Sequence, residues 1–140
     1  QIRVELCPPD YDLDAGTVQH SPLDLDVLET LKRHAEMYSS MHISEKLRSE
    51  AEFLRSLEGN LIGVLSDASP LPLEATKEAA VPGILVSNFD WSGIYRTYVE
   101  HLESLGTHAT FLASVRPSLS LATKMYASAS LVCRLSGAPP

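Results

Sequence analysis

The stretch VPGILVSNFDWSGIYRTY, residues 81–98, changes its hydrophobic period in the middle and indicates the fold. Residues 83–87 form a short apolar run, which predicts a strand buried on both faces. From Asp90 onward, apolar residues return every three or four positions, which predicts a helix over residues 91–104 capped by Asp90. The turn between these elements, residues 88–90, follows the carboxyl end of the predicted strand. Open α/β sheets bind their ligands at that edge, so the turn is a candidate site.

The chain on both sides of this stretch alternates strands and helices in the same way. Other apolar runs predict strands over residues 2–7, 61–65 and 131–135, and helical periodicity predicts helices over residues 27–58, 73–80 and 109–129. Such alternation predicts right-handed crossovers on one parallel sheet. We therefore predict an α/β fold, a Rossmann-like parallel sheet of about four strands flanked by helices.

Two details of the helices are open at this stage. Asp26 is a good N-cap for residues 27–58, which form either one bent helix or two helices in tandem. Ser44 offers a second cap, and Ser39-Ser40 weakens the middle without forbidding a helix. Pro117 is expected to break or kink the last helical segment and to start its second half.

Composition and charge restrict the class of protein. With 140 residues, 44% of them hydrophobic and 21% charged, the chain is expected to form a single soluble domain over residues 1–140. Its formal net charge is −7 and it has no basic run, which disfavours a nucleic-acid partner because such proteins gather Lys and Arg on one face.

Other features predict where the protein works. No segment approaches about 18 consecutive apolar residues, and no basic-then-apolar start resembles a signal peptide, so we expect a cytoplasmic protein with no membrane partner. Cys7 and Cys133 fall in predicted strands without metal-type spacing and are expected to be small buried thiols. The chain opens at Gln1 directly in one predicted strand and stops soon after another, so we expect it to be a fragment of something longer.

Polar residues follow the predicted strands, and a parallel sheet would bring them to one edge. Asp67 is the best candidate for a general base, because partial burial at the end of a strand raises the pKa of a carboxyl. The alternative is that Asp67 and Ser69 only form the entry turn of the next helix. Asn88 and Asp90 offer an amide and a carboxylate to a sugar hydroxyl or a phosphate, or else close the turn and cap the helix.

Aromatic and loop residues supply the remaining candidates. Trp91, with Tyr95 and Tyr98 on the same helical face, forms either a stacking platform for a sugar ring or part of the core. The polar loop over residues 10–25 carries Asp14, Gln19 and His20, and His20 is its candidate for acid–base chemistry; the alternative is a solvated turn. No histidine spacing indicates a metal site, and there is no nucleophile elbow, Walker loop or dinucleotide fingerprint.

Several of these residues recur in a known arrangement. Asp14, Gly16 and Gln19 form D-x-G-x-x-Q, followed by S-D-A-S-P at residues 66–70, S-N-F-D-W-S-G-I-Y at residues 87–95 and C-R-L at residues 133–135. In order and spacing this resembles the glycosyltransferase-like domain that precedes the sugar-kinase domain in plant-type L-arabinokinases, and related predicted bacterial glycosyltransferases. The chain departs from that pattern at Gly93, where a larger residue is usual, and at His20.

The resemblance implies part of the N-terminal, acceptor-side half of a GT-B fold. The sugar acceptor would bind Asp14, Gln19, Ser69, Asn88, Asp90 and Trp91, with Asp67 and His20 as the catalytic candidates. A nucleotide-sugar donor would bind a missing C-terminal half, no cofactor would bind within this chain, and a sugar kinase domain is a possible neighbour. The isolated chain is then expected to transfer no sugar. The alternative is a non-catalytic scaffold that binds sugar or a partner beside a kinase domain.

Overall fold

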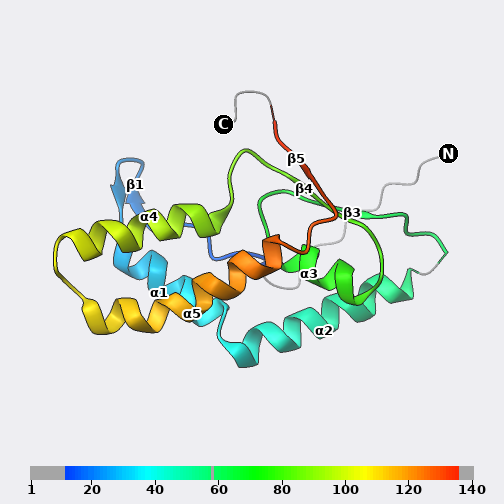
Figure 1. Ribbon diagram of the computed structural model, residues 1–140, viewed down its shortest axis with the longest axis horizontal. Helices are drawn as coiled ribbons and strands as arrows, with labels where there is room; N and C mark the ends of the chain where they lie inside the picture. Colours follow the sequence, from blue (N-terminus) through cyan, green and yellow to red (C-terminus); the bar gives the residue numbers. More distant parts are fainter. Residues whose placement is uncertain (1–11, 58, 136–140) are drawn as a thin grey trace.

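The computed structural model describes residues 12–57 and 59–135 and contains a three-stranded parallel sheet with helices packed on one side of it (Figure 1). The elements are β1 (Gln19–Ser21), β2 (Asp24–Leu25), α1 (Val27–Met37), α2 (Ser40–Ser56), β3 (Val64–Ser66), α3 (Leu71–Glu78), β4 (Gly83–Val86), α4 (Trp91–Ser104), α5 (Ala109–Tyr126) and β5 (Leu131–Cys133). The strand order is β3-β4-β5, and both pairings are parallel. The prediction of a mixed α/β fold with a parallel sheet is confirmed. The sheet has three strands rather than about four, because the predicted strand over residues 2–7 lies outside the described residues.

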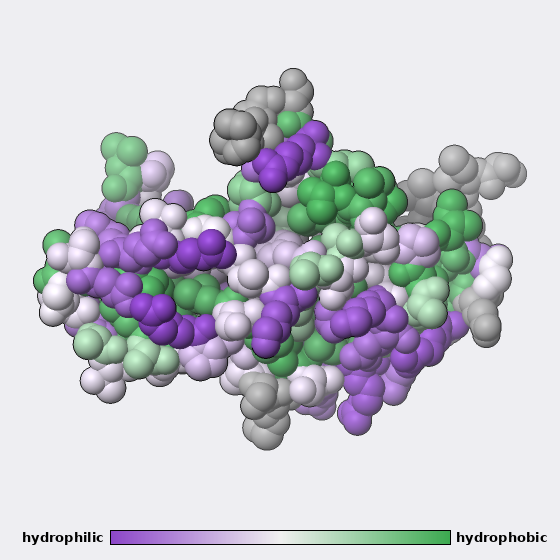
Figure 2. Space-filling model, viewed as in Figure 1, coloured by the Kyte–Doolittle hydropathy of each residue, from purple (hydrophilic) through white to green (hydrophobic). Residues whose placement is uncertain are grey.

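The sheet is covered less completely than the sequence predicted. Leu65, Ile84 and Leu131 are neighbours in register and therefore share one face. Leu65 is 73% and Leu131 54% exposed, since the helices lie on the other side of the sheet (Figure 1), and hydrophobic surface is visible over this region in Figure 2. The expectation of strands buried on both faces is thus wrong for the described residues. Cys133, expected to be buried, is exposed because it lies on the short strand at the margin of this sheet.

The long helical segment near the amino end consists of two helices. Asp26 caps α1 by accepting a 2.8 Å hydrogen bond from the Glu29 N–H, as predicted. The second cap is Ser39, in extended conformation at φ −63° and ψ 141°, and not Ser44, which lies inside α2. The chain therefore turns at the serine pair that weakens helix, and α2 leaves at an angle to α1 (Figure 1).

The carboxyl-terminal helices are more regular than expected. α4 spans the predicted 91–104 range, with Asp90 as its N-cap. α5 runs without a break through Pro117, so the prediction that this proline starts a second helix is wrong. Pro117 is exposed, so its ring lies at the surface and not in the packed interior. A proline inside a helix removes one backbone hydrogen bond without necessarily ending the helix.

The core lies where α1, α4 and α5 meet, and a second cluster joins them to α2 and α3. The first contains Ala15, Leu31, Tyr95, Val99, Leu102, Leu112 and Val115, and the second contains Tyr38, Ile43, Leu71, Ala122 and Met125. α3 packs closely on the sheet: a Cβ added to Gly83 of β4 would lie 2.4 Å from the Thr76 hydroxyl. Glycine is thus required at position 83 by this close approach.

Two further features concern the surface. Residues 10–25 were expected to form a polar loop, but part of this segment pairs as the antiparallel hairpin β1–β2. In the part of the chain that the structure describes, no helix has the length and apolar character needed to cross a membrane.

Candidate functional site

The carboxyl edge of the parallel sheet brings two of the predicted segments together. Leu65 and Ser66 of β3 lie beside Ile84 and Leu85 of β4, so the segments after both strands leave from the same edge. These segments carry Asp67 and Ser69 after β3, and Asn88 and Asp90 after β4. The convergence that the sequence predicted therefore holds for these two loops.

A tyrosine from a distant helix joins the two loops. The Tyr126 hydroxyl, near the end of α5, donates a hydrogen bond to the Ala68 carbonyl and accepts one of 3.1 Å from the Trp91 N–H. A single phenol thus connects the turn after β3 to the start of α4. Tyr126 was not among the predicted site residues, and nothing in the sequence indicated this connection.

The loop that carries Asp14 is held against the same edge from both sides. The Ser69 hydroxyl, buried in the structure, donates a 2.8 Å hydrogen bond to the Leu13 carbonyl, 56 residues earlier. The Tyr95 hydroxyl donates a 2.7 Å hydrogen bond to the carbonyl of Gly16, which has a positive φ of 59°. Three segments distant in sequence therefore meet around Asp14.

The electrostatics of this region follow from burial and from the Asp14 carboxylate. Burial raises the pKa of Tyr38, Tyr95 and Tyr126 above the usual tyrosine range, and the negative charge of Asp14 raises each of them further. The Trp91 N–H opposes this shift at Tyr126, whereas the Asp90 carboxylate adds to it. The three phenols therefore stay neutral at physiological pH and act as hydrogen-bond donors and acceptors.

Asp90 performs the capping role that the sequence offered as an alternative. Its Oδ1 accepts a 2.7 Å hydrogen bond from the Gly93 N–H and a second hydrogen bond from the Ser92 hydroxyl. A carboxylate at this position also faces the positive end of the helix dipole. Both hydrogen bonds use the same oxygen, which leaves Oδ2 as the oxygen available to a ligand.

The residues around Asp90 differ in exposure. Asp67 and Asn88 are exposed, so the burial from which a basic Asp67 was inferred is not present. Phe89 is 46% exposed and packs edge-on against Trp91, with 5.2 Å between ring centroids. Trp91 is half-buried and stacks on Tyr95 at 5.7 Å. The most accessible ring at the edge is therefore Phe89, which the sequence analysis did not select.

Two predicted residues lie elsewhere. Gln19 and His20 belong to the hairpin, which lies far from the sheet in Figure 1. The His20 side chain is 64% exposed, and its Nε2 lies 3.4 Å from the Asp26 carboxylate. The Glu29 N–H and His20 lower the pKa of that carboxyl. The structure therefore does not bring His20 to the edge that holds Asp67.

Asp14 also lines a small hollow on its other side. This hollow has a volume of about 260 Å³ and lies between the Asp14 loop and helices α1 and α2. Arg33 forms an ion pair of 3.2 Å with Asp12, and the Lys46 ammonium donates to the Asp12 carbonyl. Asp14 is therefore the predicted site residue with both a defined hollow and buried phenols beside it. Across residues 12–57 and 59–135, no group of three His, Cys, Asp or Glu side chains is placed to hold a metal ion.

With the geometry described, the class of protein follows from the fold: an α/β protein with a parallel sheet and polar groups at its carboxyl edge. Comparison with known proteins finds a partial similarity. The chain is 34% identical over 87 residues, 62% of its length, to L-arabinokinase of Arabidopsis thaliana, and this match spans 8% of that protein. No protein-family model matches the chain, and no solved structure matches it. The chain is therefore similar to a small part of an L-arabinokinase.

Proposed function

We propose that the carboxyl edge of the sheet binds a sugar, and that this chain is the acceptor-side part of a glycosyltransferase-like protein of the GT-B type. The meeting of the Asp14, Ser69 and Asp90 segments at one edge is the observation that carries the proposal. The partial similarity to L-arabinokinase supports a sugar as the ligand. A nucleotide-sugar donor would be bound by a separate C-terminal half.

The proposed roles follow the positions of the side chains. Asn88 and the free oxygen of Asp90 bind sugar hydroxyls, because amides and carboxylates offer donors and acceptors to them. The Trp91 ring packs edge-on against the Phe89 ring, so the aromatic contact to a sugar ring involves both residues. Asp67, exposed at the same edge, orients the acceptor hydroxyl. Gln19 and His20 would reach such a ligand only if it extended toward the hairpin.

A non-catalytic sugar-binding scaffold is the second candidate. The exposure of Asp67 favours it, since carboxylates that act as bases at neutral pH are usually desolvated. The two candidates share the sugar site and differ in whether Asp67 takes part in a reaction.

Sugar binding is tested by titrating the purified chain with L-arabinose and following the fluorescence of Trp91, the single tryptophan. We expect a saturable change with a Kd on the order of 1 mM, since small ligands in open sites bind weakly. Asn88→Ala should weaken binding by about tenfold, a loss of about 1.4 kcal/mol. Asp24→Asn in the exposed hairpin should not weaken it. If neither L-arabinose nor another pentose changes the fluorescence or the NMR spectrum, the sugar site is wrong.

The choice between enzyme and scaffold needs the full-length protein. Asp67→Asn should lower the rate of sugar transfer if Asp67 orients the acceptor, whereas an unchanged rate would remove it from the chemistry. The isolated chain should bind sugar without transferring it. Turnover by the purified 140 residues would contradict the proposed division between two halves.

A further inference from the structure

His34 of α1 is an ionisable side chain enclosed in the core without a polar contact. It is 0% exposed, and its ring centroid lies 4.6 Å from that of Tyr38 and 4.5 Å from that of Tyr95. Within the described residues, neither of its ring nitrogens has a hydrogen-bond partner. A charged imidazole in this position would lose its hydration and gain nothing in return. An opening that brings water to the ring therefore favours its protonation.

Three helices and one loop surround the His34 ring. α1 itself contributes Tyr38, α4 contributes Tyr95, and α5 contributes the Ser118 backbone. The loop before β1 packs in the same region, since Ala15, which is 3% exposed, belongs to one buried cluster with Tyr95. The loop is therefore part of what separates His34 from solvent.

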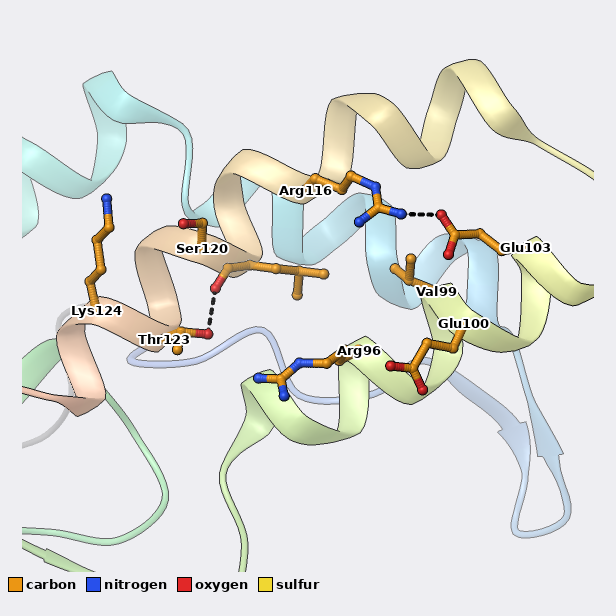
Figure 3. A pocket seen from close by; sticks show the side chains of 9 residues that line it. Arg96, Val99, Glu100, Glu103, Arg116, Ser120, Thr123 and Lys124 are labelled. Carbon is orange, nitrogen blue, oxygen red and sulfur yellow. Dashed lines mark hydrogen bonds and ion pairs between the residues drawn. The ribbon is translucent and has the colours of Figure 1, made fainter.

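The charged groups of this region lie outside the phenol rings. Asp14 and Tyr126 raise the pKa of Tyr38 and Tyr95, and Arg33 lowers that of Tyr95, so these groups act on the phenols. The charged residues that Figure 3 labels on α4 and α5 are exposed and line the groove between these helices: Arg96, Glu100, Glu103, Arg116 and Lys124. In the closed core a protonated His34 would thus lie against phenol rings, with no carboxylate partner among the described residues.

The loop is the part of this enclosure that is most easily released. α4 and α5 are joined by apolar packing and by the ion pair between Glu103 and Arg116 (Figure 3). Residues 12–18, in contrast, form no helix or strand, and their backbone is held by side chains. Besides the hydroxyls of Ser69 and Tyr95 described above, the Thr30 hydroxyl accepts a 2.9 Å hydrogen bond from the Val18 N–H. Segments with so few contacts open at a lower free energy than the core.

We propose that residues 12–18 form an acid-sensitive latch, in which uptake of a proton by His34 accompanies release of the loop from Tyr95 and Thr30. In the closed form the His34 ring is shielded from water and neutral. In the open form it is hydrated and charged, and Asp14 moves with the loop. The proton binds better to the open form, so acid shifts the equilibrium toward that form. The latch does not depend on whether the sheet edge binds a sugar.

The expected size of the effect follows from two pKa values. Burial lowers the pKa of His34 to about 4 in the closed form, whereas a hydrated imidazole keeps its usual value of 6.5. Between these values the open form binds more protons than the closed form, so the open fraction rises as the pH falls through this window. From pH 7 to pH 5 the open fraction should increase about 20-fold.

Hydrogen exchange of the Val18 amide measures the opening, because this N–H is bonded to Thr30 in the closed form. After correction for the intrinsic pH dependence of exchange, the opening constant at pH 5 should be about 20-fold larger than at pH 7. Adding about 1 M urea should leave Val18 exchange unchanged, because a local opening exposes little surface. The same urea should speed the exchange of core amides in α5, which need global unfolding.

Two substitutions and one titration assign the effect to His34. His34→Leu keeps an apolar side chain in the core and should reduce the change in the Val18 opening constant to less than about twofold. His42→Gln is the matched control, since His42 is exposed and lines the hollow beside Asp14, and it should keep the full change. NMR titration of the original chain should show His34 unprotonated in the folded form from pH 7 down to about 5.5.

Each result supports or overturns the latch. An unchanged Val18 opening constant between pH 7 and pH 5 overturns it, and so does an equal change in His34→Leu. Val18 exchange that responds to urea as the core amides do would show global unfolding and overturn a local opening. Protonation of His34 in the folded chain near pH 6.5 would show that burial does not keep the ring neutral. If His34→Leu fails to fold, the exchange, urea and NMR measurements on the original chain still decide the proposal.

Discussion

The Tyr95 hydroxyl donates a 2.7 Å hydrogen bond to the carbonyl of Gly16, a residue 79 positions earlier in the chain. Tyr95 is 1% exposed and lies on the face of α4 that packs in the core, so this hydrogen bond attaches the loop before β1 to the buried core. The position of Asp14, two residues before Gly16, depends on this contact and on the hydrogen bond from Ser69 to Leu13.

Tyr95→Phe tests the role of this hydrogen bond. The ring stays in the core, so the loss should be limited to the hydrogen bond and the unpaired carbonyl, about 1–2 kcal/mol in the free energy of unfolding. Amide hydrogen exchange should also become faster in residues 14–18. Urea unfolding and exchange measurements check both, with Tyr98→Phe as the control because Tyr98 is half-buried on the same helix. A loss of stability without faster exchange in the loop would contradict the proposed fixing of the Asp14 segment.

Tyr126→Phe tests the connection between the two loops at the sheet edge. It removes the partner of both the Ala68 carbonyl and the Trp91 N–H, so we expect destabilisation of about 1–3 kcal/mol. Trp91 should gain mobility, and its fluorescence anisotropy should fall. Equal anisotropy in the variant and the original chain would show that Tyr126 does not position the start of α4.

The buried His34 predicts how stability depends on pH. His34 is 0% exposed, and its ring centroid lies 4.5 Å from that of Tyr95 and 4.6 Å from that of Tyr38. Among the described residues, neither of its ring nitrogens has a hydrogen-bond partner. Burial lowers its pKa from 6.5 to about 4, although the Ser118 backbone opposes the shift. The unfolded chain therefore binds a proton between pH 6.5 and about 4 that the folded chain does not, and stability falls as the pH is lowered through this window.

The pKa shift of His34 limits how much stability is lost on lowering the pH. At about 1.4 kcal/mol per pKa unit, the loss in the free energy of unfolding is at most about 3 kcal/mol. Urea midpoints measured at pH 7 and pH 5 should differ less in His34→Leu than in the original chain. His101→Leu, at an exposed position on α4, should leave the difference unchanged. An identical pH dependence in the His34 variant would sink this assignment.

Gly83→Ala tests the close contact between α3 and the sheet. The added methyl would lie 2.4 Å from the Thr76 hydroxyl, which donates a 2.7 Å hydrogen bond to the Leu73 carbonyl. Relief of the clash must move Thr76 or lift α3, so we expect a loss of about 1–3 kcal/mol in the free energy of unfolding. Thermal or urea unfolding measures it, and a neutral effect would show that α3 packs less closely than described.

Gly93→Ala is expected to change the free energy of unfolding in the opposite direction to Gly83→Ala. Gly93 lies in the first turn of α4, where an added Cβ would make ordinary contact at 3.5 Å with the Asp90 carboxylate. Alanine is the better helix former, so we expect a gain of up to about 1 kcal/mol. A destabilised variant would indicate that the backbone at position 93 must approach something more closely than its present neighbours do.

Part of the fold could be predicted because its signals are local. The 91–104 helix and its Asp90 cap follow from spacing and a capping residue within one short stretch, and both are confirmed. The parallel direction of the sheet follows from the alternation of strands and helices. The range of α5 was less predictable, since whether Pro117 interrupts a helix depends on whether the carbonyl it leaves unpaired faces solvent or core.

The candidate site was predictable in its loops and not in its contacts. Asp67, Ser69, Asn88 and Asp90 were found because polar residues after apolar runs indicate strand ends. The hydrogen bonds from Tyr95, Tyr126 and Ser69 join residues 79, 58 and 56 positions apart, and no sequence period reports such a pairing. The exposure of Asp67 could not be predicted from the sequence either, because it depends on which segments cover the sheet edge.

The amino-acid sequence by itself determined the order and type of the main helices and the parallel direction of the strands, because periodicity, caps and strand ends act over a few neighbouring residues. Only the tertiary structure decided which side chains meet and how far Asp67 and Cys133 are exposed. Those properties arise from packing between segments far apart in the chain, where the position of each group is fixed by all the others at once.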